Sequence, residues 1–597
     1  MHNGKRKGSF DAAKDFKGAI KKLIKYDKAL IRLLIISLIL SFISSVLTII
    51  GPDKLKDITN IITQNMMTGI DLDSVKNIAI VLIIIYALSS IFSYLQGFIM
   101  TTVTARFQKK MRNDISKKIN LLPLSYFDKT TVGDILSRVT NDVDTIGFTM
   151  TESLSGIVGS ATLLIGSVIM MFYTNWILAI TAILSTIIGL VFVVIIIVRS
   201  QKYFNEVQKS LGDINGHIEE VFTGHNVVQA YNAEEETNDE FDQINNHLFE
   251  CGRKSQFLSG LMHPLMGFTG NFGFVAVCVV GSILVMNNII DFGVIVAFMI
   301  YIKFFTRPLM QIAQSFSGFQ SAAAASERVF EFLEEEEMDN EKDFSDNLEI
   351  NSVKGNLVFK NVRFGYDKEK IIIKNLSAEA KSGEKIAIVG PTGAGKTTIV
   401  NLLMKFYNIN GGDILIDGHS IHNLTRENIH DLFTMVLQDT WIFEGTIKEN
   451  IRYNNKNVTD EEIIEACKKV GLHHLIKTLP NGYDTVLSDN DSLSAGEKQL
   501  LTIARAMISK KPYLILDEAT SNVDTRTEEL VSKAMDKLTA GKTSFIIAHR
   551  LSTIRNADMI LVINDGNIIE QGTHDELIAK NGFYAELYNS QFQELLD

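Results

Sequence analysis

The sequence predicts a multidomain protein in which an all-α bundle of six transmembrane helices is followed by an α/β domain of the P-loop type. Three observations carry this prediction. Long apolar runs occupy residues 30–310, the chain from about residue 340 onward is rich in Gly, Asp, Glu and Lys, and residues 390–397 match a phosphate-binding loop. The length of 597 residues also exceeds that of a single domain, which is roughly 100 to 200 residues.

Net charge and cysteine spacing exclude two classes of function. The formal net charge is −11, and Lys and Arg crowd only the start of the chain, so we expect no nucleic-acid partner. The cysteines, Cys251, Cys278 and Cys467, lie far apart and lack the spacing of a disulfide framework or a zinc site. We therefore expect free thiols, as in proteins of the reducing cytoplasm.

Six windows of mostly apolar residues are long enough to cross a hydrocarbon core of about 30 Å. Far more Lys and Arg than Asp precede the first window, which predicts that residues 1–28 are cytoplasmic. The first window is too long for the apolar part of a signal peptide, and no small-residue cleavage site follows it. The windows run approximately from Ala29 to Ile50, Ile78 to Met100, Ser153 to Tyr173, Trp176 to Val198, Leu261 to Met286 and Ile289 to Phe305.

The connections between these windows alternate between long and minimal. The long ones, residues 101–152 and 199–260, are cytoplasmic by this orientation and have the mixed pattern of helices that continue beyond the bilayer. Each contains a break, near Pro123 and near Gly224, where we expect a short transverse element. The predicted domains are a cytoplasmic segment (1–28), the transmembrane domain with its two long cytoplasmic loops (29–333), an acidic linker (334–350) and the α/β domain (351–597).

Charged residues within a membrane span are costly and are often functional. Lys303 and Arg307 are the nearest candidates, at the cytoplasmic end of the sixth window, where long basic side chains reach the lipid head groups. We favour this explanation over a role in a cavity. The run from Gly267 to Gly273 is explained equally well by a substrate path and by tight helix packing.

The strongest motif is Gly390-Pro391-Thr392-Gly393-Ala394-Gly395-Lys396-Thr397, which fits the phosphate loop G-x-x-x-x-G-K-[ST]. A β-branched strand, Lys385–Val389, precedes it, and an amphipathic helix begins at Thr398, as the motif requires. We therefore predict that residues from Gly390 to Thr398 bind ATP. Backbone N–H groups and the helix N-terminus would surround the phosphates, Lys396 would neutralise the β- and γ-phosphates, and the Thr397 hydroxyl would bind Mg²⁺.

Two carboxylates end a predicted buried strand, Tyr513–Asp517. Asp517 would hold Mg²⁺ through its water shell, and Glu518 would polarise an attacking water. Two acids that merely end a strand would be the default explanation in a chain without the phosphate loop. The loop makes catalysis the better interpretation.

Between these motifs, Leu493-Ser494-Ala495-Gly496-Glu497-Lys498-Gln499 resembles the signature of the ABC transporter family. Other features resemble that family in order: Tyr366 as the adenine-stacking aromatic, Gln438 as the Q-loop, Ser521–Asp524 as the D-loop and His549 as the switch histidine. The breaks in the cytoplasmic loops look like the coupling loops of ABC exporters. The resemblance spans the chain and implies a half-transporter, with an ABC-specific helical subdomain in the second domain.

The resemblance also implies roles for these residues. Tyr366 would stack on adenine, Gln438 would contact Mg²⁺ and the attacking water, and His549 would contact the γ-phosphate. Ser494, Gly496 and Glu497 belong to the signature, which in the family binds the ATP held by the opposite subunit. ATP and Mg²⁺ are thus the implied cofactors, and dimerisation is required for hydrolysis.

The signature departs from the usual Leu-Ser-Gly-Gly-Gln at Ala495 and Glu497. An added methyl group and a carboxylate near the phosphates would weaken the site formed with this signature. The chain's own phosphate loop, Glu518 and His549 match the pattern expected for ATP hydrolysis. That asymmetry resembles the catalytically intact subunit of heterodimeric bacterial multidrug exporters, so we favour a heterodimer over a homodimer.

The expected function is ATP-driven export of a small amphipathic or hydrophobic substrate, a drug or a lipid, by alternating access. The alternatives are a peptide exporter and an ABC regulatory protein that does not transport. A soluble ABC protein is disfavoured by the six windows, and an importer by the fusion of both domains in one chain. We expect a multi-pass protein of a bacterial plasma membrane, with the N-terminus and the ATPase domain in the cytoplasm.

Overall fold

The computed structural model describes residues 15–67, 69–341, 344, 346–367, 370–437, 440–455, 457–487, 493–517, 525–548 and 554–592. The chain forms two compact units. Unit 1 comprises Met1–Asn120 and Val132–Glu335, and unit 2 comprises Leu121–Thr131 and Glu336–Asp597. Unit 1 is helical, and unit 2 contains the β-sheets.

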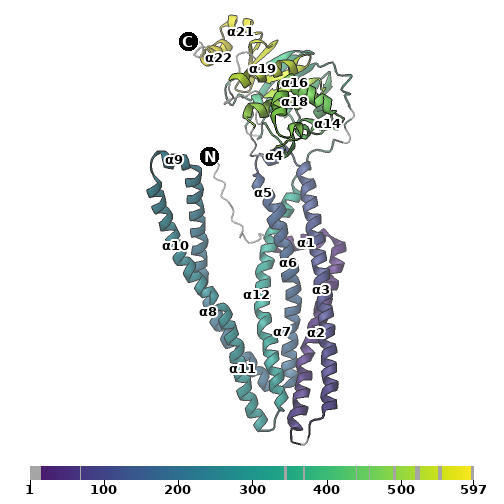
Figure 1. Ribbon diagram of the computed structural model, residues 1–597, viewed down its shortest axis with the longest axis vertical. Coiled ribbons are helices and arrows are strands. Elements are labelled where there is room, and N and C mark those ends of the chain that lie inside the picture. Colours follow the sequence, from purple (N-terminus) through teal and green to yellow (C-terminus); the bar gives the residue numbers. More distant parts are fainter. Residues whose placement is uncertain are drawn as a thin grey trace. The chain divides into compact units, whose positions relative to one another are not determined.

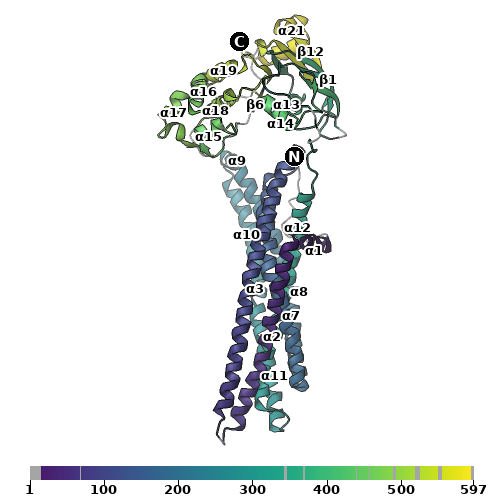
Figure 2. The ribbon, with the colours of Figure 1, turned by 90° about the vertical axis from the view of Figure 1, so that its right-hand side faces the viewer.

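Unit 1 contains six helical segments that are long and apolar enough to cross a membrane, as the sequence predicts. Its helices run largely alongside one another, whereas α1 lies across them (Figures 1 and 2). The helices are α1 (Phe16–Tyr26), α2 (Lys28–Gln64), α3 (Leu72–Leu121), α5 (Val132–Ser137), α6 (Val143–Thr149), α7 (Ser155–Thr174), α8 (Trp176–Thr223), α9 (His225–Ala230), α10 (Glu234–Gly260), α11 (Met262–Met286) and α12 (Phe292–Glu334).

The long loops are helical extensions of the spans, which confirms the sequence prediction. Helix α3 continues to Leu121 and α8 to Thr223, and the short α9 follows at the predicted break. Two π-helical turns join α5, α6 and α7 into one continuous path. The sixth span begins at Phe292, three residues later than predicted, because Asn288 adopts a positive φ of 54° in the preceding turn.

Helix α12 packs against α2, α7 and α11, and α8 packs against α10 and α11. Small residues permit the close approach of these helices: a Cβ added at Gly281 of α11 would lie 2.8 Å from a side-chain carbon of Ile295. Near the C-terminal end of α12, Nε of Arg328 donates to Oδ2 of the buried Asp142 over 3.0 Å. This ion pair fastens the end of α12 to the first π-helical turn.

Unit 2 contains a ten-stranded sheet with the order β5-β4-β1-β2-β12-β11-β3-β10-β9-β6. Strands β11, β3, β10, β9 and β6 are parallel, and the strands on the other side are mostly antiparallel. The strands are β1 (Leu357–Phe364), β2 (Ile373–Ala380), β3 (Lys385–Val389), β4 (Gly411–Ile416), β5 (His419–Ser420), β6 (Phe433–Val436), β9 (Tyr513–Asp517), β10 (Thr543–Ile547), β11 (Met559–Asn564) and β12 (Asn567–Gly572).

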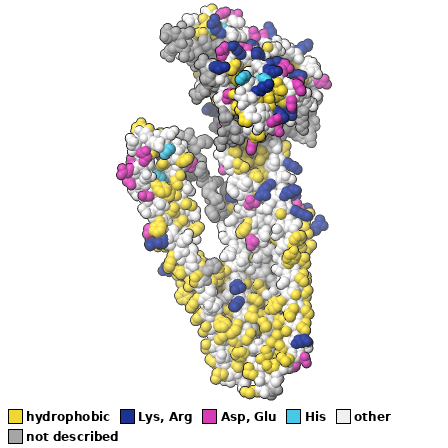
Figure 3. Space-filling view, in the orientation of Figure 1, with side chains coloured by type: hydrophobic (Ala, Val, Ile, Leu, Met, Phe, Trp, Pro, Cys, Tyr) yellow, Lys and Arg dark blue, Asp and Glu magenta, His cyan; other side chains and the backbone are white. Residues whose placement is uncertain are grey.

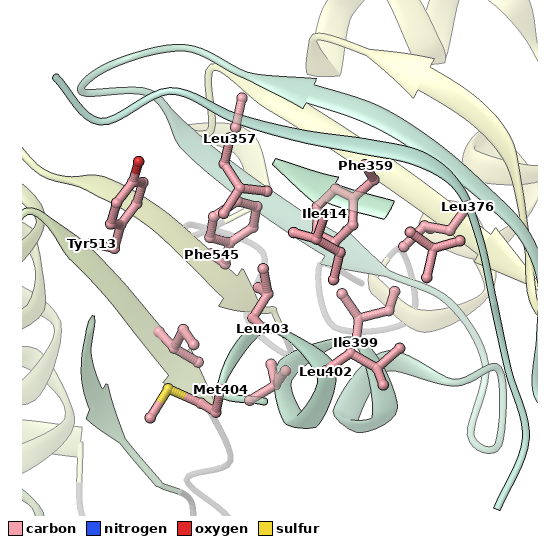
Figure 4. Packing of buried hydrophobic residues seen from close by; sticks show 14 of the residues in the cluster. Leu357, Phe359, Leu376, Ile399, Leu402, Leu403, Met404, Ile414, Tyr513 and Phe545 are labelled. Atoms are coloured by element: carbon pink, nitrogen blue, oxygen red, sulfur yellow. The ribbon is translucent and has the colours of Figure 1, made fainter. Parts of the chain in front are cut away.

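The described part of unit 2 contains three clusters of buried hydrophobic residues, of which the smallest includes Ile560, Leu577 and Tyr584. The first lies under the sheet around α13 (Lys396–Leu403), whose Ile399, Leu402 and Leu403 meet Phe359, Ile414 and Phe545 (Figure 4). The second holds a helical part that lies to one side of the sheet in Figure 2. Its helices are α15 (Ile447–Arg452), α16 (Asp460–Val470), α17 (His473–Thr478), α18 (Ala495–Ile508) and α19 (Thr525–Thr539). This part corresponds to the helical subdomain that the sequence predicts.

Two separate chain segments are fastened to the sheet part of unit 2. In the segment after α12, the carboxylate of Glu341 accepts from Arg426 (Nη1 to Oε1, 2.8 Å) and pairs with the buried Lys405 (3.2 Å). In the other segment, which contains α4 (Leu124–Phe127), Asp128 accepts from the Tyr407 hydroxyl. Residues 405–407, directly after α13, therefore hold both segments.

Candidate ATP-binding site

The phosphate loop lies between the central strand β3 and α13, as its sequence context requires. Gly393 and Gly395 have φ values of 84° and 103°, which only glycine adopts without strain. A Cβ added at Gly390 would lie 2.1 Å from the carbonyl oxygen of Ile563 on the neighbouring strand. The loop therefore needs glycine at three positions, two for backbone conformation and one for close packing.

Lys396 lies against the loop that precedes it. Its ammonium group donates to the carbonyl oxygens of Gly390 (2.8 Å) and Pro391 (3.1 Å). Burial lowers the pKa of Lys396, and the nearby negative charge of Asp517 opposes that shift. This position keeps the amine at the mouth of the loop, close to the N-terminus of α13, where an anion is favoured.

The order of the parallel strands brings the predicted catalytic segments to one edge of the sheet. Strands β3, β10 and β9 are neighbours, with Ile547 paired to both Ile388 and Asp517. The phosphate loop follows the carboxyl end of β3, and Asp517 is the last residue of β9, so both lie at the same end of the parallel strands. Asp517 is buried at the end of β9. Gln438, Glu518 and His549 lie outside the described residues, so their roles stay predictions.

Tyr366 lies beside the first turn of α13. Its hydroxyl is 3.2 Å from Oγ1 of the buried Thr398, and Asn401 donates to it over 3.4 Å. Tyr366 is 44% exposed and both of its ring contacts are edge to face, which leaves room for an adenine base to stack on it. Tyr366 and Thr398, which the sequence places in one site, are therefore in contact.

The sequence analysis did not identify Tyr407, whose ring packs against that of Tyr366. The ring of Tyr407 meets that of Tyr366 edge to face, with centroids 5.0 Å apart, and Phe364 makes a similar contact. Tyr407 is also the residue that donates to Asp128. No spacing rule connects these positions, because two strands, the phosphate loop and a helix separate Tyr366 from Tyr407 in the chain.

The signature residues begin α18 and form a capping box. Ser494 Oγ accepts from the Glu497 N–H (3.3 Å), and the Glu497 carboxylate accepts from the Ser494 N–H (2.7 Å). Ser494 is exposed and Gly496 is buried. Within the described part of the chain, no hydrogen bond or ion pair joins residues 494–497 to residues 390–398.

These groups fit a nucleoside triphosphate. The loop offers backbone N–H groups, a lysine ammonium group and a helix N-terminus to phosphate oxygens, and Tyr366 offers a ring face to the base. The exposed hydroxyl of Thr397 and the carboxylate of Asp517 are hard oxygen donors of the kind that Mg²⁺ prefers.

Comparison with known proteins agrees with this geometry. Residues 34–309 match the family model of the ABC transporter transmembrane region, and residues 373–521 match that of the ABC transporter ATPase. The chain belongs to the ABC transporter family. It is a half-transporter, with the six-span domain and the ATPase domain in one chain.

Three relatives illustrate the range of the family. An uncharacterised ABC transporter ATP-binding protein of Bacillus subtilis, YfiC, is 39% identical over 98% of this chain and 96% of its own length. A fatty acid ABC transporter ATP-binding/permease protein of Mycobacterium bovis is 41% identical over 87% of this chain and 82% of its own. A probable multidrug resistance ABC transporter of B. subtilis, YheH, is 36% identical over 84% and 75%.

The family establishes the outline of the activity. This half-transporter binds and hydrolyses ATP and belongs to the exporters. It is a multi-pass membrane protein with a cytoplasmic ATPase domain, and a half-transporter works as a dimer.

Proposed function

We propose that this half-transporter exports a small amphipathic or hydrophobic substrate, a drug or a lipid, by alternating access. The observation that carries the proposal is the separation of the phosphate loop from the signature within one chain. Ser494 is exposed, and its oxygen already accepts from its own helix, so its O–H is left to donate to a group from outside the subunit. A nucleotide held by the partner's phosphate loop supplies such a group, so ATP would join two ATPase domains.

The chain's residues would divide the work at each composite site. Gly390, Pro391, Thr392, Gly393, Ala394, Gly395, Lys396, Thr397 and Thr398 would bind the phosphates, and Tyr366 would orient the base. Glu518 would accept a proton from the attacking water, with His549 and Gln438 positioning that water. Thr397, Gln438 and Asp517 would hold Mg²⁺, which would neutralise charge on the β- and γ-phosphates. Ser494, Gly496 and Glu497 would complete the site of the opposite subunit.

The two segments held by residues 405–407 support coupling of the ATPase domain to the membrane domain. One segment follows α12 and the other follows α3, and both attach directly after the helix of the phosphate loop. A change in that helix would therefore reach both segments. We propose that ATP binding and hydrolysis switch the membrane domain between inward-facing and outward-facing states by this route.

The substrate class is proposed from the relatives and the membrane domain together. The relatives bear names for a fatty acid transporter and a multidrug transporter, both of which act on amphipathic or apolar molecules. Peptide export and a regulatory role without transport are the alternatives. We also propose a bacterial plasma membrane as the location and, because of the unusual signature, a heterodimer rather than a homodimer.

The test is Mg²⁺-dependent ATPase activity of the purified chain in lipid, alone and with candidate partner half-transporters. Activity that appears only with a partner, and that Glu518→Gln removes, would support an asymmetric pair. Robust turnover by the chain alone, lost in Glu518→Gln, would overturn the heterodimer and establish a working homodimer. ATP-driven uptake of a fluorescent drug or lipid into inverted vesicles then tests export, and its absence despite ATP hydrolysis would favour a regulatory protein.

A further inference from the structure

One side of α12 is polar and exposed within the membrane bundle. Its polar residues recur at helical spacing and therefore share one side of the helix. They are Lys303, Arg307, Gln314, Ser317 and Ser321, all exposed. Towards the outer end of α12 the same side continues with the apolar, partly buried Val296, Met299 and Ile300. From the outer end of α12 to its cytoplasmic end, the side chains on this side are first apolar, then basic and then neutral polar.

Helix contacts place Lys303 about halfway along its span, and Arg307 about 6 Å nearer the cytoplasmic end. A Cβ added at Gly273 of α11 would lie 3.6 Å from Ile302 and 3.3 Å from Ser185 of α8. Ser185 lies about 14 Å along α8 from its first residue, which is about half of a 30 Å core. Lys303 follows Ile302 directly, and Arg307 is one turn further on. The expectation that these side chains reach cytoplasmic head groups stays a prediction.

No carboxylate of the described residues forms an ion pair with Lys303 or Arg307. Among the described residues, neither side chain makes an ion pair or a hydrogen bond. Helix α11 contains no Asp or Glu, α8 contains none before Glu206, and α12 contains none before Glu327. Because an unpaired cation is costly at mid-membrane, an anion bound there would be strongly favoured.

The polar character of this side of α12 suits contact with water better than contact with lipid tails. In the space-filling view a cleft separates the arm of α8, α9 and α10 from the rest of unit 1, and basic side chains lie on the mostly apolar and neutral surface near its lower end (Figure 3). Gln314, Ser317 and Ser321 extend the polar side from this level towards the cytoplasmic end of α12. Amides and hydroxyls on a lipid-facing side would lack partners, whereas in a cleft they meet water.

We propose that Lys303 and Arg307 bind the head group of an anionic amphiphile, a molecule with an apolar chain and a carboxylate or phosphate group. This inference rests on the proposed export of amphipathic molecules and names their charge. Ammonium and guanidinium groups bind carboxylates and phosphates through charge-assisted hydrogen bonds. Val296, Met299 and Ile300 lie where the apolar chain would extend.

Binding of three matched probes to the full chain tests this site. The probes are a pyrene-labelled fatty acid and the alcohol and amine of the same chain, titrated into nanodiscs of zwitterionic phosphatidylcholine that hold the transporter. In the double variant Lys303→Gln/Arg307→Gln, we expect the affinity for the acid to fall about tenfold or more, while that for the alcohol stays within about twofold. The charge-preserving pair Lys303→Arg/Arg307→Lys should retain most of the affinity for the acid.

A matched control removes two cations elsewhere. Arg199→Gln/Lys202→Gln neutralises two exposed residues of α8 beyond its apolar run, and affinity for the acid should not change. Inorganic phosphate added in excess should not displace the fatty acid, because it lacks the apolar chain. Displacement by phosphate would replace the amphiphile with a free anion as the ligand and overturn the proposal.

Other outcomes separate the site from the proposed function. If the wild type binds acid and alcohol equally, or the double variant keeps its affinity for the acid, the head-group site is wrong while amphiphile export stands. An equal loss in the α8 control would also overturn the site, because it would indicate a general effect of charge. If the wild type hydrolyses ATP but neither binds nor transports any of the three probes, both the site and amphiphile export are wrong.

Discussion

The phosphate-loop side and the signature side of unit 2 are built differently. The loop lies between the central strand β3 and α13, and Tyr366 beside it contacts two separate segments of the chain, through Thr398 and Tyr407. Ser494 and Glu497 instead hydrogen-bond to each other, in a capping box within one helix turn. The contrast teaches that one side of the proposed site is organised by tertiary structure, whereas the other is organised locally and left open to a second subunit.

The largest effect on ATP hydrolysis is expected for Lys396→Ala, which tests the phosphate-loop side. Loss of the ammonium group should lower ATP hydrolysis about a hundredfold or more, because a charged donor to the phosphates disappears from a partly buried site. ATPase assays in lipid measure the loss, with Lys381→Ala, an exposed lysine in the turn between β2 and β3, as the control. An equal loss in both variants would mean that Lys396 has no special role.

Ser494→Ala tests the other side. We expect turnover of the assembled dimer to fall about tenfold to a hundredfold, since a hydrogen bond to a charged group is lost across the interface. ATP affinity of the isolated chain should hardly change. The control is Thr459→Ala, which removes the same kind of cap from α16, costs about 1 kcal/mol of helix stability and should leave turnover intact. If the isolated chain loses ATP affinity with Ser494→Ala, the division between the two sides is wrong.

A smaller effect is expected at Tyr366. Tyr366→Ala should weaken ATP binding about tenfold, because stacking on a base is worth about 1 to 3 kcal/mol. Tyr366→Phe keeps the ring and loses only the contacts of the hydroxyl with Thr398 and Asn401, so its affinity should stay within about twofold of the wild type. Titration with a fluorescent ATP analogue measures both variants. A larger loss in the Phe variant would show that the hydroxyl, not the ring, matters.

The smallest effect is expected for Glu497→Gln. An amide oxygen accepts from the Ser494 N–H as a carboxylate does, so the capping box should persist and turnover should change less than about threefold. Glu462→Gln alters the matching capping box of α16 and serves as the control. A large gain of turnover with Glu497→Gln alone would mean that the carboxylate weakens the composite site, which is the sequence-based expectation and would sharpen the case for an asymmetric pair.

Local patterns predicted the parts of the fold that depend on neighbouring residues. The phosphate loop, the strand before it and the helix after it follow from a contiguous run in which glycine and lysine occur at fixed spacing. The six spans and the break at Gly224 likewise follow from runs of apolar residues and their interruption. The start of the sixth span was placed too early, since hydropathy does not register the turn at Asn288.

Contacts between distant segments were not predictable from the chain. Tyr407 supports Tyr366 only because β1 and the segment after α13 meet in the folded sheet domain, and Glu341 meets Lys405 and Arg426 for the same reason. Each residue alone is an ordinary tyrosine or a charged side chain.

The sequence by itself determined the two domains, the phosphate loop and the resemblance of its motifs to those of ABC transporters, because each rests on composition or on residues close together in the chain. Only the tertiary structure decided the surroundings of those residues. It placed Lys303 and Arg307 on one exposed side of α12, without a hydrogen-bond or ion-pair partner among the described residues. The physical reason is that depth and accessibility depend on which helices pack against which side, and neighbouring helices rather than neighbouring residues set that packing.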